Sequence, residues 1–209
     1  MLEYIIVKEP VDGGNHYEKH IHLADRSTTI CSRIVYMATR SEFTHAAISL
    51  DRNFDKLYTF GRKYKRLMLP AGFVRESVYD GLLGDSDDMR CAVYEIKISD
   101  ISYKRLTKFL SHMEKNKEKY RYSILGLPMC KFNRKYERKG YFFCSQFVYY
   151  ALSKSGTIER TMEPSLVRPM DLSELSEANE IFRGKIRELR IADRLFFDTS
   201  LDMRPETDL

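Results

Sequence analysis

The sequence predicts an α+β fold in which a small antiparallel β-sheet packs against helices. Three segments, 43–51, 57–60 and 91–98, alternate their side chains with period two, which is typical of strands with a buried face. Two others, 100–119 and 144–152, repeat apolar residues at helical spacing and are predicted to be amphipathic helices. The presence of both periodicities in one chain favours the α+β class.

The first strands of the sheet are expected to form a hairpin. Ala46 and Ile48 share one face of the segment 43–51, and His45 lies on the other. Turn residues follow, so the chain is predicted to return as a β-hairpin centred near Asn53. Such a hairpin brings residues 58–61 alongside His45.

The remaining elements show the same two patterns. They are short strands at 4–7 and 72–78 and a helix at 27–39 that Ser27 or Thr28 would cap. Asp100 is expected to cap the helix that runs to about Lys119, and Asp171 a second, shorter helix. Residues 181–187 look like a tight hairpin around Gly184, although a helix is possible there.

Length and charge limit the organisation of the chain and its partners. At 209 residues, 43% of them hydrophobic, the chain fits a single domain over 1–197 and a mobile polar tail over 198–209. The net charge is +5, and basic residues are dense between 115 and 139. That density would suit an acidic partner or peripheral membrane contact, while a solvated basic face is the simpler interpretation. No nucleic-acid-binding motif is present, so no nucleic-acid partner is expected.

The cysteines and histidines show no metal-site spacing. The four cysteines are Cys31, Cys91, Cys130 and Cys144. His16, His20 and His22 lie close together, but no carboxylate or cysteine completes a recognisable set, so neither a metal nor a cofactor is expected. No signal peptide and no run of about 18 apolar residues is evident. A cytoplasmic protein with reduced thiols and no transmembrane segment is therefore expected.

Cys144 is expected to stand at the start of a helix. Three aromatic residues precede it, and the apolar stripe of the helix begins just after it, at Phe147 and Val148. A thiol at this position faces unpaired backbone N–H groups and the positive end of the helix dipole, which favour the thiolate. Cys144 is therefore a candidate nucleophile.

A thiol nucleophile needs a base, and His45 is the best candidate. It is the histidine that begins a strongly apolar, strand-like segment. A histidine on a strand that faces a cysteine at a helix N-terminus is the working geometry of papain-like thiol enzymes. A structural histidine at a strand edge is the alternative.

The order of these residues resembles the circularly permuted NlpC-like branch of the papain-like superfamily, to which lecithin retinol acyltransferase-like enzymes are related. Ordinary members place the cysteine helix first, whereas here His45 precedes Cys144 by 99 residues. The similar segments are 44–51 (the histidine strand), 57–62, 72–76, 143–148 (the cysteine helix) and 168–172. The resemblance spans roughly residues 3–190 and implies a permuted papain-like fold.

The resemblance also implies a third polar residue, on the strand after the histidine, that holds the imidazole. Tyr58 and Thr59 are the candidates there, and Thr59 is favoured because a small hydroxyl orients the ring without filling the pocket. Glu76 is the alternative, because a carboxylate would also stabilise the imidazolium. Relatives often have Glu two residues after the cysteine; Gln146 stands there and keeps the hydrogen bonding without the charge.

These features predict a cysteine-dependent hydrolase that forms an acyl-enzyme. The backbone N–H of Cys144 is the natural oxyanion donor, and Tyr120 or Tyr122 would add a side-chain donor, although aromatic packing explains both tyrosines more simply. The resemblance implies an amide or ester substrate, with peptidase or amidase activity expected first. A lipid acyltransferase or thioesterase, and a catalytically degenerate domain that binds a peptide or lipid, are the alternatives.

Overall fold

The computed structural model describes residues 2–6, 21–24, 45–51, 54–64, 69–85 and 87–192, and for the first two of these ranges it describes the backbone alone. The side chains of His16, His20 and His22, the predicted helix at 27–39 and the predicted mobile tail at 198–209 lie outside this description.

The described strands form two adjoining sheets. The four-stranded sheet has the order β1 (Leu2–Ile6), β2 (Ile21–Ala24), β6 (Arg90–Ile96) and β9 (Ala178–Lys185). The five-stranded sheet has the order β3 (His45–Ser49), β4 (Leu57–Arg62), β5 (Ala71–Glu76), β7 (Arg121–Tyr122) and β8 (Tyr141–Phe142). Strand β3 also lies beside β1 and β2. Most pairs are antiparallel, as predicted, but β1 with β6 and β7 with β8 run parallel, so both sheets are mixed.

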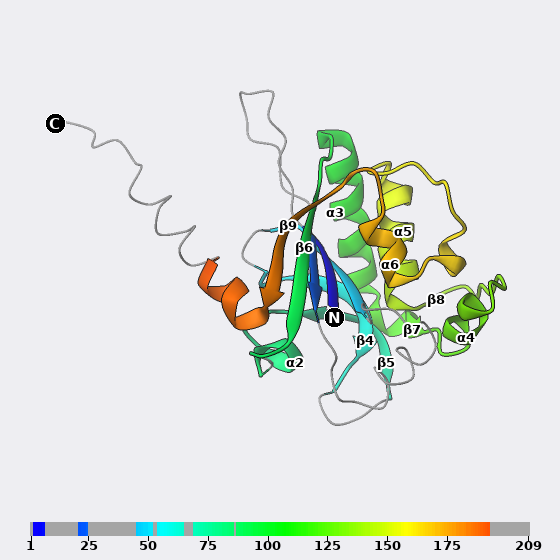
Figure 1. Cartoon of the computed structure of the whole chain (residues 1–209). Helices are drawn as coiled ribbons and strands as arrows, with labels where there is room; N and C mark the ends of the chain where they lie inside the picture. The colour runs from blue at the N-terminus through cyan, green and yellow to red at the C-terminus, as the bar shows by residue number, and fades with distance from the viewer. Residues whose placement is uncertain are drawn as a thin grey trace.

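Helices cover the sheets on both sides. The long helices α3 (Asp100–Lys115) and α5 (Cys144–Ser155) lie on one side, and the helical segment 186–192 lies on the other (Figure 1). The shorter helices are α2 (Gly81–Gly84), α4 (Gly126–Lys131) and α6 (Pro169–Ser173), with 3₁₀ turns η1 (Lys117–Lys119) and η2 (Pro164–Leu166). This mixture of strands and packed helices confirms the α+β class.

Both faces of β3 are buried, which explains its apolar run. Ala46 and Ile48 join the larger core cluster beneath α3 and α5, together with Phe147. Ala47, on the other face, joins a second cluster that includes Ile186. The period-two alternation of side chains therefore sends alternate residues into two cores rather than into a core and solvent.

The hairpin and the strand predictions are confirmed. In the hairpin, Ala47 lies opposite Thr59 and Ile48 opposite Tyr58, a register that centres the turn on position 53. The strands predicted at 4–7, 72–78 and 91–98 are present at Leu2–Ile6, Ala71–Glu76 and Arg90–Ile96.

Two helix predictions are wrong in their details. Helix α3 is capped by Ser99, whose hydroxyl accepts the Ser102 N–H at 3.2 Å, rather than by Asp100, and it ends at Lys115. Asp171 does not precede α6 but stands inside it, where its carboxylate accepts the backbone N–H of Arg168 at 2.7 Å. In both cases the side chain that reaches the free N–H groups decides the helix start.

The predicted hairpin around Gly184 is also wrong. Residues 178–185 form the single strand β9, which pairs antiparallel with β6 and is followed by the helical segment 186–192. Gly184 serves close packing rather than a turn, because a Cβ there would lie 2.6 Å from Glu188 Oε2 and 2.8 Å from Phe182 Cζ. Pairing along the whole of β9 outweighed the local turn signal.

Candidate active site

Cys144 is the first residue of α5. Phe143 before it is extended (φ −100°, ψ 169°), and its backbone N–H donates to Gln146 Oε1 at 3.3 Å, which fixes where the helix begins. One turn later the fully buried Phe147 packs on Phe60 of β4 and Phe73 of β5, at ring-centre distances of 5.2 Å and 5.6 Å. The start of α5 is therefore held against the strands that carry Thr59 and Glu76.

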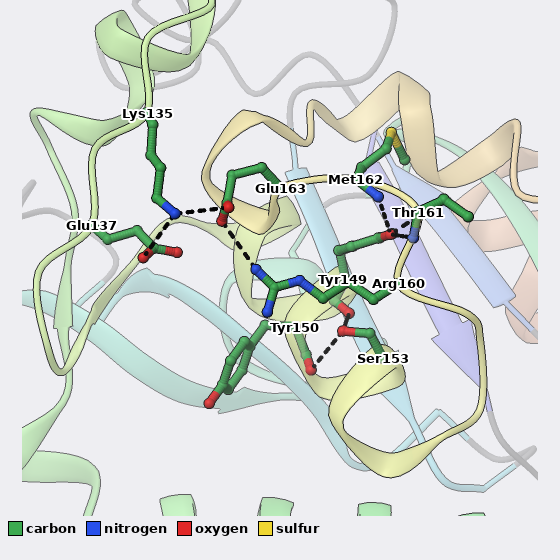
Figure 2. A network of polar contacts seen from close by, with 9 residues as sticks. All are labelled: Lys135, Glu137, Tyr149, Tyr150, Ser153, Arg160, Thr161, Met162 and Glu163. Carbon is green, nitrogen blue, oxygen red and sulfur yellow. Dashed lines mark hydrogen bonds and ion pairs between the residues drawn. The ribbon is translucent and has the colours of Figure 1, made fainter.

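The rest of α5 is anchored by a buried tyrosine. The Tyr149 hydroxyl accepts the backbone N–H groups of Thr161 and Met162, both at 2.9 Å (Figure 2). The helix ends at Gly156, whose positive φ of 77° suits glycine. These contacts bind the segment after the helix back onto it.

His45 opens β3, on the strand face shared with Thr59 and Glu76. The Thr59 hydroxyl lies 3.2 Å from His45 Nε2 and donates to the Ala46 carbonyl at 2.6 Å. A hydroxyl has one proton, so toward His45 it acts as the acceptor of an Nε2–H. The tautomer with its proton on Nε2 leaves Nδ1 free to accept a proton from a thiol, and Cys144 lies close enough for the two groups to shift each other's pKa.

Glu76 approaches the same nitrogen from the neighbouring strand. Its Oε2 lies 3.6 Å from His45 Nε2, and the side chains are 12% and 17% exposed respectively. That oxygen is buried, and none of the residues that the structure describes lies within hydrogen-bond distance of it. A carboxylate left in this position has its charge directed at the imidazole, where it stabilises the protonated ring.

The site favours a thiolate and an imidazolium. Burial opposes the charge on His45, but hydrogen bonds and charges from Cys144 and Glu76 outweigh it and raise the pKa of His45 to about 10. Burial also opposes ionisation of Cys144, yet the hydrogen bond and charge of His45, with backbone hydrogen bonds from Ala46 and Ser145, lower the pKa of this thiol. Each group thus stabilises the charged form of the other.

The other described cysteines have the opposite character. Burial raises the pKa of Cys91 far above its ordinary value, and Glu188 adds to the effect. Burial followed by the charge of Asp171 raises the pKa of Cys130 to about 11. Both are therefore neutral thiols at physiological pH, unlike Cys144.

Other predicted site residues lie in packed surroundings. Tyr58 lies on the opposite strand face from Thr59, in the core, with its ring stacked 6.1 Å from Phe73. Gln146 is 3% exposed, and its side-chain oxygen caps α5. The Tyr58 ring thus packs in the core and faces away from His45, and the hydrogen bond expected of Gln146 is made to the start of α5. Tyr122 packs against Leu127, Cys130 and Phe143, beside the start of α5.

One residue of the site was missed by the sequence analysis. Gly61 lies beside the imidazole and the carboxylate, because a Cβ there would be 3.5 Å from both His45 Cε1 and Glu76 Oε1. The hairpin register, which places Gly61 opposite His45, was the signal that would have identified it. A glycine at this point leaves room for the imidazole and carboxylate to meet.

Neither a metal site nor a membrane span is found in the described part of the chain. Its His, Cys, Asp and Glu side chains include no group of three or more placed to hold a metal ion. Within the same ranges, none of the helices has the length and hydropathy that a bilayer crossing requires. Comparison of the chain with family profiles, with curated proteins and with solved structures found no match.

Proposed function

We propose that the protein is a cysteine-dependent hydrolase of amide or ester bonds, built as a circularly permuted NlpC-like, papain-like domain. The observation that carries the proposal is the line of three groups: the Cys144 thiol, the His45 imidazole and the Glu76 carboxylate. Their order along the chain, histidine before cysteine, matches the permuted arrangement that the sequence resembles. A peptide or other amide is the first substrate class, in keeping with the papain-like geometry.

The proposed reaction begins with the ion pair already formed. The Cys144 thiolate attacks the substrate carbonyl, and the backbone N–H at the start of α5 stabilises the oxyanion. His45 then gives its Nδ1 proton to the leaving amine or alcohol, which leaves an acyl-enzyme. Water gives a proton to His45 as it attacks the thioester, and the acid is released, which leaves the Cys144 thiolate and the His45 imidazolium as at the start.

Glu76 is assigned the third role ahead of Thr59. Both face His45 Nε2, but only Glu76 carries a charge that stabilises the imidazolium. The Thr59 hydroxyl is a neutral acceptor that is also tied to the Ala46 carbonyl, so it orients the ring. The sequence analysis favoured Thr59 for the third role and gave Glu76 as the alternative; in this proposal both residues contribute.

Selective alkylation tests the proposal. With iodoacetamide near neutral pH, Cys144 is expected to react at least tenfold faster than Cys91 or Cys130, because only its pKa is lowered. Iodoacetamide is small enough to suit a residue that is 1% exposed. Mass spectrometry of peptides gives each rate, and His45→Ala should slow Cys144 alone. Equal and slow labelling of all three cysteines would refute the proposed nucleophile.

A further inference from the structure

Helix α4 presents an apolar face to solvent. Leu125 and Phe132 are the residues that flank α4, and with Pro128 inside it they are spaced i, i+3 and i+7, the spacing of one helix side. Leu125 is 61% and Phe132 69% exposed, and the adjacent Ile124 is 55% exposed. Single exposed apolar residues are common on proteins, but a row of them on one helix face marks an interaction surface. Figure 1 shows α4 at the edge of the molecule, away from α2 and β9.

The chain around this helix is strongly basic. Residues 115–139 contain nine Lys and Arg against two Glu, a net charge of +7, although the whole chain carries only +5. Both glutamates are paired with lysines, Glu118 with Lys63 and Glu137 with Lys135. Exposed Arg121 precedes the helix, and exposed Arg134 and Lys139 follow it. The apolar face is therefore flanked along the chain by cations.

We propose that α4 and its flanking residues dock the protein on an anionic lipid bilayer. An interfacial helix binds membranes by placing aliphatic and aromatic side chains at the acyl-chain boundary while basic residues meet anionic headgroups. Leu125 and Phe132 would reach the acyl-chain boundary. The headgroups would be met by Arg121, Arg134 and Lys139. A nucleic acid would use the cations but leave the apolar row in water, so the bilayer accounts for more of the surface.

The docking surface is held rigidly next to the candidate site. The opposite face of α4 places Leu127 and Cys130 against Phe143, the residue before Cys144. The loop after α4 is tied to the segment after α5, because Lys135 binds Glu163 at 2.8 Å and Glu163 also binds Arg160 (Figure 2). Docking thus brings the thiol near the bilayer. Action of the thiol on a lipid ester would rest on the proposed function. The docking itself does not depend on that function.

Vesicle binding by a Cys144→Ser protein tests the docking apart from the chemistry. The protein is expected to sediment with vesicles of mixed phosphatidylglycerol and phosphatidylcholine and not with phosphatidylcholine alone. Leu125→Ser/Phe132→Ser should weaken the partition constant at least tenfold, since two apolar side chains leave the interface. Ile101→Ser/Ile191→Ser, which removes two equally exposed residues elsewhere, should bind as the parent does.

The basic residues have their own matched control. Arg121→Gln/Arg134→Gln/Lys139→Gln should weaken binding about 100-fold, the effect of three charges at an anionic surface. Lys97→Gln/Lys104→Gln/Lys108→Gln loses the same charge from exposed positions on and before α3 and should bind nearly as the parent does. Equal losses in the two triple variants would show a net-charge effect and overturn the proposal. So would no binding to anionic vesicles, or tighter binding to single-stranded DNA that Leu125→Ser/Phe132→Ser leaves unchanged.

Discussion

His45 has two ring nitrogens with different surroundings. Nε2 faces the Thr59 hydroxyl at 3.2 Å and the Glu76 carboxylate at 3.6 Å, and Cys144 is the other group that raises the pKa of the ring. Acceptors on one nitrogen keep the other available to exchange a proton with the thiol. The reactivity of Cys144 should therefore depend on groups that do not touch it.

Glu76→Gln should raise the pKa at which Cys144 becomes reactive. The amide keeps the size of the side chain but removes the charge that stabilises the His45 imidazolium. A less stable imidazolium stabilises the Cys144 thiolate less. A rise of about one pH unit in the midpoint of the labelling profile is expected, with an about tenfold slower reaction at pH values below that midpoint. Alkylation rates of Cys144 between pH 5 and 9 measure it.

Thr59→Ser serves as the control for Glu76→Gln. It keeps the hydroxyl that faces His45 and Ala46, so its labelling profile should match the wild type. An unchanged profile in Glu76→Gln would contradict the role of the carboxylate and return the third position to Thr59.

The ion pair should give the protein a plateau of stability against pH. The pKa of His45 is raised from 6.5 to about 10, and that of Cys144 is lowered from 9.0. Between about pH 6.5 and 9 the folded pair and the unfolded pair bind the same number of protons, so the contribution of the pair to stability is constant. Below pH 6.5 the histidine of the unfolded chain gains a proton, while the folded pair still holds one. Above pH 9 the cysteine of the unfolded chain loses its proton, while folded His45 keeps its own. The contribution of the pair to the unfolding free energy therefore falls on both sides of the window.

Urea unfolding from pH 5 to 10 measures this plateau. The quantity to compare is the difference in unfolding free energy between the wild type and Cys144→Ala/His45→Gln, which cancels the other titrating groups. Outside the window the difference should fall by up to about 1.4 kcal/mol per pH unit. A difference that changes steadily from pH 6.5 to 9 would show that the folded pair does not hold a single proton throughout this range, contrary to the raised pKa of His45 and the lowered pKa of Cys144.

At the scale of elements, α5 joins the candidate nucleophile to the core. Its first residue is Cys144, its buried face includes Phe147 and Leu152, and its end is marked by Gly156. Midway along it, Tyr149 is fully buried and accepts two backbone N–H groups of the following segment. The apolar stripe therefore attaches α5 to the core, and the Tyr149 hydroxyl attaches the following segment to α5.

Tyr149→Phe should lower the unfolding free energy by about 2–4 kcal/mol, because two backbone N–H groups lose their acceptor. The ring and its packing remain, so Cys144 labelling should change little. Tyr150→Phe is the matched control: within the described ranges its hydroxyl has one hydrogen bond, accepted from the exposed Lys154 ammonium at 3.1 Å, and a loss below about 0.5 kcal/mol is expected. Equal losses in the two variants, measured by urea unfolding, would contradict the anchoring role.

At the scale of the whole molecule, a hydrophobic core lies on each side of the central strands. Strand β6 contributes Ala92 and Ile96 to the core beneath α3 and α5, and Cys91 and Val93 to the core beside the segment 186–192. A strand that serves both cores couples them, so the described layers should unfold together.

Cys91 can report on that coupling. It is fully buried and its pKa is raised, so it should be alkylated only when the molecule unfolds. Its labelling midpoint in urea should coincide with the midpoint of far-UV circular dichroism. Labelling of Cys91 at lower urea would show that the second core opens by itself. Surface Ile101→Ser, which touches neither core, should leave both midpoints in place.

Local patterns in the sequence predicted much of the fold. The start of α5 at Cys144, the hairpin register and the strand at 91–98 follow from periodicity and turn residues, which act over a few positions. The hairpin near Gly184 failed because a long pairing with β6 outweighed a local signal. The Ser99 cap was missed because neighbouring Ser and Asp residues compete for the same free N–H groups.

The sequence by itself determined the candidate nucleophile and base, because a helix-start thiol and a strand-start histidine are local properties. Only the tertiary structure decided what stands behind the imidazole. Glu76 belongs to a different strand from Thr59, and the pairing of β3, β4 and β5 brings its buried Oε2 within 3.6 Å of His45 Nε2. Several polar residues could have been the neighbour of the His45 imidazole. The distances between neighbouring strands decide which one it is, and those distances are set by packing between residues that are far apart in the sequence.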